Sequence, residues 1–201
     1  FGVGYKMRSP VAKAEKLETM PSSVISLAIT SYTPVNIYEH GSQAACASGI
    51  RLSPSLVLTA FHTTEPGMVT LVGKTVVAYE MVAGFSTLDD LLLVKSPESP
   101  SHPENSIPLA SSIAPGEILV AVSNAGCENG ILKYYWVSKD SGDTIYVEGF
   151  ENREPQLGES GSGLLNSHGE LAGIVLKTNG AAASFRAIKR VIPATDIVPA
   201  K

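Results

Sequence analysis

The sequence predicts an all-β fold with two sandwiches or barrels of roughly six strands each. Short apolar runs rich in β-branched residues recur along the chain and are bounded by Gly, Pro, Ser or Asn, which is typical of strands. A stretch rich in proline and serine divides these runs into two groups of about six. The 201 residues are enough for two small barrels with real cores.

The first group of runs follows an N-terminal segment without periodicity. Residues 1–24 mix Gly, Lys, Pro and Ser and are expected to form an arm, and residues 25–98 are expected to form the first barrel. The runs assigned to its strands are SVISLAIT, VNIYE, ACASGIRL, SLVLTAF, MVTLV, KTVVAYEMV and DDLLLVK.

The second group begins after the proline-rich stretch. Residues 96–117 carry five prolines, and the inter-barrel linker is expected at residues 99–116. Residues 117–201 are expected to form the second barrel. Its strands are assigned to ILVAVSN, GILKYYWVS, TIYVEGF, SGLLN, LAGIVLK and ASFRAIKRVI, and one helical turn is expected in PATDIV.

Composition bounds the class of protein. The chain is 44% hydrophobic and 17% charged, which is typical of a globular protein. A net charge of −4 supplies no overall basic field, so no nucleic-acid partner is expected. No apolar run reaches the roughly 18 residues that cross a bilayer. The two isolated cysteines, Cys46 and Cys127, favour a reducing compartment and free thiols, with a single bridge as the less favoured alternative.

The segment GESGSG, residues 158–163, raises the question of chemistry. A serine hydroxyl becomes a nucleophile when a base, an orienting group for that base and oxyanion donors surround it. The amides of Gly158 and Ser160 can point at one oxygen if the backbone takes the tight conformation that glycine allows. Gly161 and Gly163 are expected to let a substrate backbone come close. Taken alone, the segment is more typical of an ordinary hairpin.

Two other stretches change this interpretation. His62 ends the apolar run SLVLTAFH, and the pair Asp89-Asp90 precedes a run of leucines. Taken singly, His62 is more typical of a structural histidine, and the acid pair of a solubilising strand end. The order His, Asp, Ser across both predicted barrels requires a common explanation.

The three motifs resemble those of the chymotrypsin-like serine proteases. VLTAFH is similar to that family's strand ending in Thr/Ser-Ala-Ala-His. DLLLVK is similar to Asp-Ile-Ala-Leu-Leu-Lys, which selects Asp90 over Asp89. GESGSGLL is similar to Gly-Asp-Ser-Gly-Gly-Pro-Leu, which selects Ser160 over Ser162.

The resemblance spans about residues 25–195 and implies two antiparallel six-stranded β-barrels with the active site in the cleft between them. It also implies a serine endopeptidase that cleaves a polypeptide substrate. It implies that Ser160 attacks the scissile carbonyl, that His62 takes its proton and that Asp90 holds the imidazole tautomer. The amides of Gly158 and Ser160 would bind the oxyanion. No cofactor and no metal are expected.

The same resemblance suggests residues that bind substrate. ELAGIVLKTNG is similar to the strand that lines the family's substrate groove, which indicates Leu176, Lys177 and Thr178. The position six residues before the nucleophile is Glu154, at the family's pocket floor for the residue that precedes the scissile bond. A buried carboxylate there predicts a preference for Lys or Arg. The alternative is an exposed loop in which Glu154 pairs with Arg153 or faces water.

Within the family, the chain is most similar to sobemovirus- and polerovirus-like polyprotein proteases. The Gly-x-Ser-Gly-Ser-Gly form, the absence of a disulfide framework and the short triad separations of 28 and 70 residues support this likeness. Two departures are Pro155 in place of a threonine, and Ile174 and Leu176 where those enzymes place a histidine. The implied role is processing of its own polyprotein in the host-cell cytoplasm, with membranes reached through polyprotein neighbours.

Two alternatives stay open. One is a protease-fold module that binds peptides without cleaving them. The other is a cellular HtrA-like protease, although Ser162 departs from that branch's Gly-Asn-Ser-Gly-Gly-Pro. Among the remaining candidates, His40 and His102 have no metal-ligand partner at useful spacing, and Cys127 lacks a nearby base.

Overall fold

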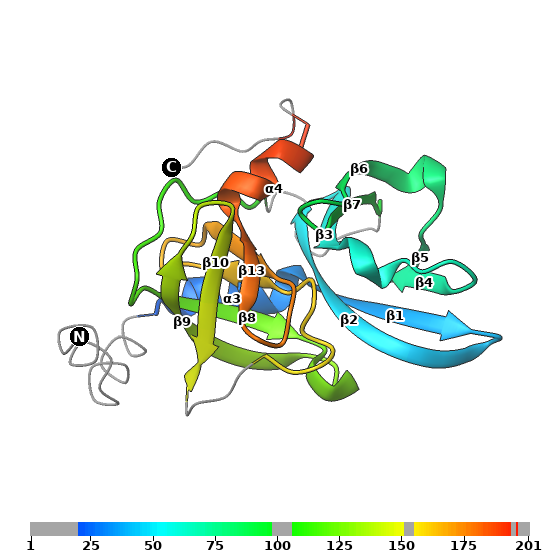
Figure 1. Ribbon diagram of the computed structural model, residues 1–201, viewed down its shortest axis with the longest axis horizontal. Coiled ribbons are helices and arrows are strands. Elements are labelled where there is room, and N and C mark those ends of the chain that lie inside the picture. The colour runs from blue at the N-terminus through cyan, green and yellow to red at the C-terminus, as the bar shows by residue number, and fades with distance from the viewer. Residues whose placement is uncertain (1–19, 98–105, 151–154, 194–195, 197–201) are drawn as a thin grey trace.

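Two β-barrels lie side by side in the computed structural model, which describes residues 20–97, 106–150, 155–193 and 196 (Figure 1). The first is a seven-stranded sheet in the order β5-β4-β1-β2-β3-β7-β6, and the second is a closed barrel in the order β10-β13-β12-β11-β8-β9. The predicted two-barrel, all-β class is confirmed. In detail the first barrel has seven strands rather than six and is open, since no pairing joins its edge strands β5 and β6 within the described residues.

The first barrel brings the ends of two strands together. Its strands are β1 (Tyr32–Glu39), β2 (Ser42–Ser53), β3 (Leu56–Ala60), β4 (Val69–Val72), β5 (Thr75–Val76), β6 (Val82–Ser86) and β7 (Leu91–Lys95), with short 3-10 helices η1 (Phe61–Thr63) and η2 (Tyr79–Met81). The fully buried β3 pairs antiparallel with β7, with Ala60 opposite Leu91. The residues just after β3 and just before β7 therefore meet at one edge of the sheet.

The second barrel is closed around an apolar interior. Its strands are β8 (Ile118–Ser123), β9 (Ile131–Asp140), β10 (Thr144–Gly149), β11 (Gly163–Leu165), β12 (Leu171–Val175) and β13 (Ala181–Ser184), and the short helix η3 (Ala125–Cys127) follows β8. Leu119, Tyr135, Val137, Ile145 and Leu164 fill the interior. Along β8, β9 and β10 the residues that face this core alternate, as in the interior of a small barrel.

The run SVISLAIT forms a helix, so the predicted strand is wrong. Helix α3 (Ser22–Ser31) buries Val24, Ala28 and Ser31, at the i, i+4, i+7 spacing of one helical face. The β-branched residues of the run favour a strand locally. Packing against β8 and β11 of the second barrel decides for the helix, and this tertiary contact is not visible in the local sequence.

The run ASFRAIKRVI is divided between a strand and a helix. Strand β13 ends at Ser184, and helix α4 (Phe185–Val191) follows immediately. Ser184 is the N-cap, since its hydroxyl accepts a hydrogen bond from the Arg186 amide at 3.2 Å. Of the expected turn PATDIV, only residues 193 and 196 are described. Within the described ranges, no helix combines the length and the hydropathy that crossing a membrane requires.

The described part of the expected linker is anchored to both barrels. The Ile107 amide donates to the Leu52 carbonyl of the first barrel at 2.9 Å, and the Ala110 amide donates to the Leu171 carbonyl of the second barrel at 2.9 Å. Ile107, Ala110 and Ile113 are buried. Residues 106–116 therefore connect the two barrels through hydrogen bonds and buried side chains.

Substitutions at two alanine-sized positions distinguish the helix from the predicted strand. Residues 24, 26 and 28 share one face of a strand, whereas in α3 Ala28 is buried and Ser26 is exposed. We expect Ala28→Asp to lower the free energy of unfolding by more than about 2 kcal/mol, because it buries a charge without a partner. Ser26→Asp should change it by less than about 0.5 kcal/mol. Urea denaturation measures both, and equal losses would contradict the helix.

Candidate active site

His62 and Asp90 meet where the fold joins β3 to β7. His62 lies in η1, directly after β3, and Asp90 immediately precedes β7. His62 Nδ1 lies 2.5 Å from Asp90 Oδ2, and the His62 backbone amide donates to Asp90 Oδ1 at 2.7 Å. Both carboxylate oxygens of Asp90 thus accept hydrogen bonds from His62. This geometry favours a proton on Nδ1 and leaves Nε2 available to accept a hydrogen bond or a proton.

The neighbouring carboxylate is engaged elsewhere. Asp89 accepts hydrogen bonds from Ser86 Oγ at 3.0 Å and from Arg190 of α4 at 3.2 Å. The turn separates the two carboxylates because Asp90 takes a left-handed conformation with φ 57°. Both residues precede β7, so the alternation of side chains along a strand does not separate them, and the backbone conformation of Asp90 does.

The pKa of His62 is raised above its ordinary value. The hydrogen bond that the His62 ring donates to Asp90 is the largest cause, and the charges of Asp90 and Glu65 add to it. Partial burial of the ring and the positive charge of Lys177 oppose the increase.

Ser160 lies in the loop before β11, here called the serine loop (residues 155–162). Its side chain is partly exposed, whereas Ser162 is fully buried in a position from which it cannot meet a substrate. The Ser160 hydroxyl donates to the Leu176 carbonyl at 3.2 Å. Within the described residues no hydrogen bond links it to His62, so in this free state the hydroxyl rests on the carbonyl after β12.

The glycines of the serine loop bring it against the first barrel. A Cβ on Gly161 would lie 2.0 Å from the Ser48 carbonyl oxygen and 2.5 Å from Thr59 Oγ1, and its φ is +88°. A Cβ on Gly163 would lie 2.4 Å from Ile50 Cδ1. From the sequence, these glycines are expected to admit a substrate backbone. In the structure they instead allow the first barrel to approach the serine loop closely. This contact sets Ser160 beside strands β2 and β3, the latter leading into His62.

The two amides proposed for the oxyanion hole are free of protein acceptors. In the part of the chain that the structure describes, neither the Gly158 amide nor the Ser160 amide donates to any group. Their peptide planes are nevertheless fixed, because the Leu157 carbonyl accepts from the Gly126 amide at 2.8 Å and the Glu159 carbonyl accepts from the Ser162 amide at 3.0 Å. Two donors with fixed peptide planes on either side of one residue are consistent with the expected oxyanion-binding role of these amides.

Sequence reasoning missed the residue between these donors. Glu159 is 0% exposed and forms an ion pair with Lys133 of β9, with Nζ and Oε2 2.8 Å apart. The same oxygen accepts a hydrogen bond from the Gln156 amide, which closes the serine loop around the carboxylate. The sequence offers two signals of this pair. One is an acidic residue inside a segment of small residues, and the other is a lysine among the apolar residues of β9.

The residues expected to bind substrate lie together beyond β12. Leu176 is half-buried, and Lys177 and Thr178 are exposed in the turn to β13. The Leu176 carbonyl that accepts from Ser160 faces the serine loop. Glu154 lies outside the described residues, so its proposed place at the pocket floor stays a prediction.

The two cysteines are bonded, which corrects the expectation of free thiols in a reducing compartment. Cys46 of β2 and Cys127 of η3 form a disulfide with their Cα atoms 5.7 Å apart. They are separated by 81 residues, and only the docking of the two barrels brings them together. The bond removes the basis on which the reducing compartment was inferred.

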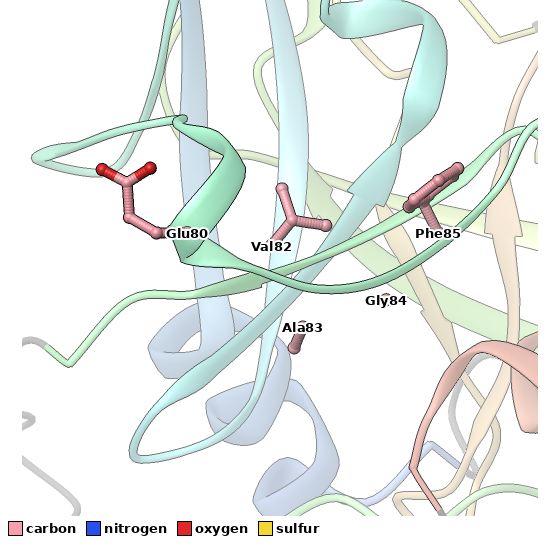
Figure 2. Close-up of a pocket in the computed structure, with 5 residues that line it drawn as sticks. All are labelled: Glu80, Val82, Ala83, Gly84 and Phe85. Atoms are coloured by element: carbon pink, nitrogen blue, oxygen red, sulfur yellow. The ribbon is translucent and has the colours of Figure 1, made fainter.

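Two surface pockets lie on the first barrel. One, of about 330 Å³, is lined by Glu80 of η2 and by Val82, Ala83, Gly84 and Phe85 of β6 (Figure 2). The other, of about 280 Å³, includes Phe61, whose ring stacks on that of Phe85 at 5.7 Å. Neither pocket is lined by His62, Asp90 or Ser160. In the ranges that the structure describes, no group of three His, Cys, Asp or Glu side chains is arranged to hold a metal ion.

Known proteins resemble this chain in structure but not detectably in sequence. No family model matches the chain, and no curated protein matches it. A serine endoprotease from Yersinia pestis superposes with a TM-score of 0.67 and 18% identity, over 83% of this chain and 63% of that one. The Rv3671c protease of M. tuberculosis in its active form gives 0.66 and 16%, over 92% and 89%.

A third similar structure is the HtrA-type protease AlgW with a tripeptide, at a TM-score of 0.62 and 18% identity. It is covered over 60% of its length, so this chain spans less than two thirds of the AlgW and Yersinia pestis proteins. At such identities the likeness establishes the fold. The chain has the two-barrel, chymotrypsin-like fold of these proteins.

The Lys133–Glu159 pair provides a direct test of how the serine loop is held. Lys133→Met leaves a buried carboxylate without its cation, and we expect it to lower the free energy of unfolding by about 3–5 kcal/mol. The double variant Lys133→Met/Glu159→Gln removes both charges and should recover most of this loss. Chemical denaturation of the two variants measures the difference. A small loss in Lys133→Met, or an additive loss in the double variant, would contradict a buried ion pair.

Proposed function

We propose that this chain is a serine endopeptidase in which His62, Asp90 and Ser160 form the catalytic triad. The single observation that supports this most strongly is that Asp90 holds His62 by two hydrogen bonds, while the Gly158 and Ser160 amides of the serine loop donate to no protein group within the described residues. The fold shared with solved serine proteases adds to this support.

The geometry supports acyl transfer in the following order. With Nδ1 bonded to Asp90, His62 has Nε2 available to take the proton of Ser160 as its oxygen attacks the scissile carbonyl. The negative charge that develops on the carbonyl oxygen is stabilised by the amides of Gly158 and Ser160. His62 then gives the proton to the leaving amine, and a water molecule, activated by the same nitrogen, releases the acyl group.

Before attack, the Ser160 hydroxyl has to leave the Leu176 carbonyl. Rotation about its Cα–Cβ bond turns the hydroxyl from that acceptor toward His62. An extended substrate that donates a backbone amide to the Leu176 carbonyl would occupy the acceptor and favour this rotation. Catalytic hydrogen bonds that tighten only on substrate binding are common in free enzymes. Leu176, Lys177 and Thr178 would line the path of the substrate backbone.

For the physiological substrate we propose a polypeptide that belongs to the chain's own polyprotein. The support is the sequence resemblance to viral polyprotein proteases, and with it come the proposals of action in the host-cell cytoplasm and of membrane association through polyprotein neighbours. The similarity to HtrA-type structures supports a second candidate, a cellular quality-control protease. A catalytically silent peptide-binding module is the third.

Two substrates separate these candidates. A polyprotein protease should cut a few sites in a peptide library with one dominant sequence and leave reduced, unfolded casein largely intact. A quality-control protease should degrade the casein at many sites. A silent module should cut neither. Cleavage after Lys or Arg that is lost in Glu154→Gln would also support the proposed role of Glu154.

Replacement of the proposed nucleophile tests the mechanism. We expect Ser160→Ala to lower kcat by about 10⁴- to 10⁶-fold, because the histidine then has no hydroxyl to activate. Labelling by a fluorophosphonate probe should disappear in parallel. Ser162→Ala is the matched control, and it should keep labelling, since Ser162 is buried. Retained labelling of Ser160→Ala together with loss in Ser162→Ala would assign the wrong serine.

The pH dependence of kcat/KM tests the role of His62. The base acts when it is neutral, and its pKa is raised, so the acid limb of kcat/KM should lie at a pH above the ordinary histidine pKa. Lys177→Gln removes a charge that lowers this pKa and should move the limb to higher pH. Glu65→Gln removes a charge that raises the pKa and should move it to lower pH. Shifts in the same direction, or none, would contradict His62 as the base.

A further inference from the structure

One peptide bond in the serine loop has its orientation set from outside the loop. In a trans peptide the C=O and the following N–H point in opposite directions. The Leu157 carbonyl accepts the Gly126 amide at 2.8 Å, so the Gly158 amide must point away from η3. Rotation of this peptide by half a turn would direct a carbonyl, rather than an N–H, at a developing oxyanion. The Gly126–Leu157 hydrogen bond therefore selects the donor.

The turn that supplies this hydrogen bond is held in an unfavourable conformation. Gly126 and Cys127 both have left-handed φ values, 62° and 61°, and Cys127 is not a glycine. The turn's own bonds are those of the Cys127 amide to the Asn124 carbonyl at 2.9 Å and of the Glu128 amide to the Ala125 carbonyl at 3.0 Å. The described residues 126–130 are exposed, so little packing supports the turn from outside.

The disulfide provides the covalent support of this turn, in addition to the hydrogen bond of the Asn124 amide to Ser48 Oγ. It joins Cys127 of this turn to Cys46 in β2 of the first barrel. It also packs on the loop itself, since a Cβ on Gly158 would lie 3.2 Å from Cys46 Sγ and 2.1 Å from the Asn124 carbonyl oxygen. On its other side the loop is open to solvent, with Leu157 81% exposed. The disulfide, η3 and Leu157 thus form one continuous connection to the Gly158 amide.

We propose that the Cys46–Cys127 disulfide positions the Gly158 amide for catalysis through the Gly126–Leu157 hydrogen bond, so that turnover depends on the redox state of this pair. The proposal rests on the proposed protease function. Cys46 and Cys127 are positioning residues, since neither touches the reacting atoms. Reduction removes the covalent connection between η3 and the first barrel and leaves the hydrogen bond of the Asn124 amide to Ser48 Oγ as a weaker connection. The η3 turn can then relax, the Leu157 carbonyl loses its fixed donor, and the Leu157–Gly158 peptide can rotate.

The redox step uses a dithiol as reductant. One thiolate of the dithiol attacks a sulfur of the disulfide, forms a mixed disulfide with that cysteine and releases the other cysteine as a thiolate. The second thiol of the dithiol then attacks the mixed disulfide and releases the first cysteine. Cys46 and Cys127 gain two electrons and two protons in total, and the dithiol becomes a cyclic disulfide. Cys127 lies at the exposed surface, which makes its sulfur the accessible point of attack.

The test compares the oxidised chain, the chain reduced with dithiothreitol and the variant Cys46→Ser/Cys127→Ser. Steady-state kinetics on one fluorogenic peptide chosen from a library, and the rate of labelling by diisopropyl fluorophosphate, are measured together. We expect reduction to lower kcat by between about tenfold and 10³-fold, the latter being the cost of losing an oxyanion donor. KM should change less than twofold, labelling should slow in parallel, and reoxidation should restore both. The double variant should be slow and insensitive to dithiothreitol.

Two controls separate positioning from loss of the fold. Near-ultraviolet circular dichroism should show that the reduced chain is folded at the assay temperature. Val72→Ala opens a cavity in the first-barrel core around Val35, Val57 and Val94, and it should lower the melting temperature with kcat retained. Unchanged kcat in the reduced, folded chain overturns the proposal, as does a loss that appears only with unfolding or in KM. Failure of the oxidised chain to turn over or label overturns the proposed function instead.

Discussion

Ser48 of β2 is the point at which the first barrel holds the serine loop of the second. Its amide donates to the Ser160 carbonyl at 2.8 Å, and its hydroxyl donates to the Gly158 carbonyl at 2.7 Å while accepting the Asn124 amide at 2.8 Å. The residue is fully buried, so these bonds form away from water, where leaving any of them unmade is costly. The rest of the candidate site depends on this contact, because His62 and Ser160 belong to different barrels.

The polar interior of the serine loop complements this contact from the opposite side. The Lys133–Glu159 pair fixes the loop to β9, while Ser48 fixes it to β2. Hydrogen bonds then constrain nearly every peptide of the loop, and within the described residues the amides of Leu157, Gly158 and Ser160 donate to no protein group. A loop constrained in this way loses little entropy when it binds a charged intermediate, which is the physical basis of electrostatic preorganisation. Because Ser48 belongs to the first barrel, the conformation of the serine loop also depends on how the two barrels pack together.

The sequence predicts the strands of this protein better than its helices. Strands such as β3 and β7 are short apolar runs between turn residues, and their pattern is local. The run that became α3 has a strand-like composition, and its helical face is stabilised by β8, which is distant in the chain. The disulfide was misjudged for the same reason, since its cysteines are 81 residues apart and meet only across the barrel interface.

The candidate site shows the same division between local and long-range information. His62, Asp90 and Ser160 were identified from short motifs, because each motif combines a reactive side chain with the strand that carries it. Lys133 and Ser48 were not identified, because a lysine in β9 and a serine in β2 have no local feature that indicates a partner in the serine loop. The partner of Asp89 is Arg190 of α4, which lies far from it in the sequence, so no local pattern indicates this ion pair.

The central claim is that one oxyanion is bound between the amides of Gly158 and Ser160 while the first barrel supplies the base. A crystal structure of the chain with a peptide boronate bound to Ser160 tests this most directly. The account predicts a boronate oxygen within about 2.7–3.1 Å of both amides and His62 Nε2 within hydrogen-bond distance of a second oxygen. A covalent bond to another residue, or a Leu157 carbonyl in place of the Gly158 amide at the boronate, would contradict it.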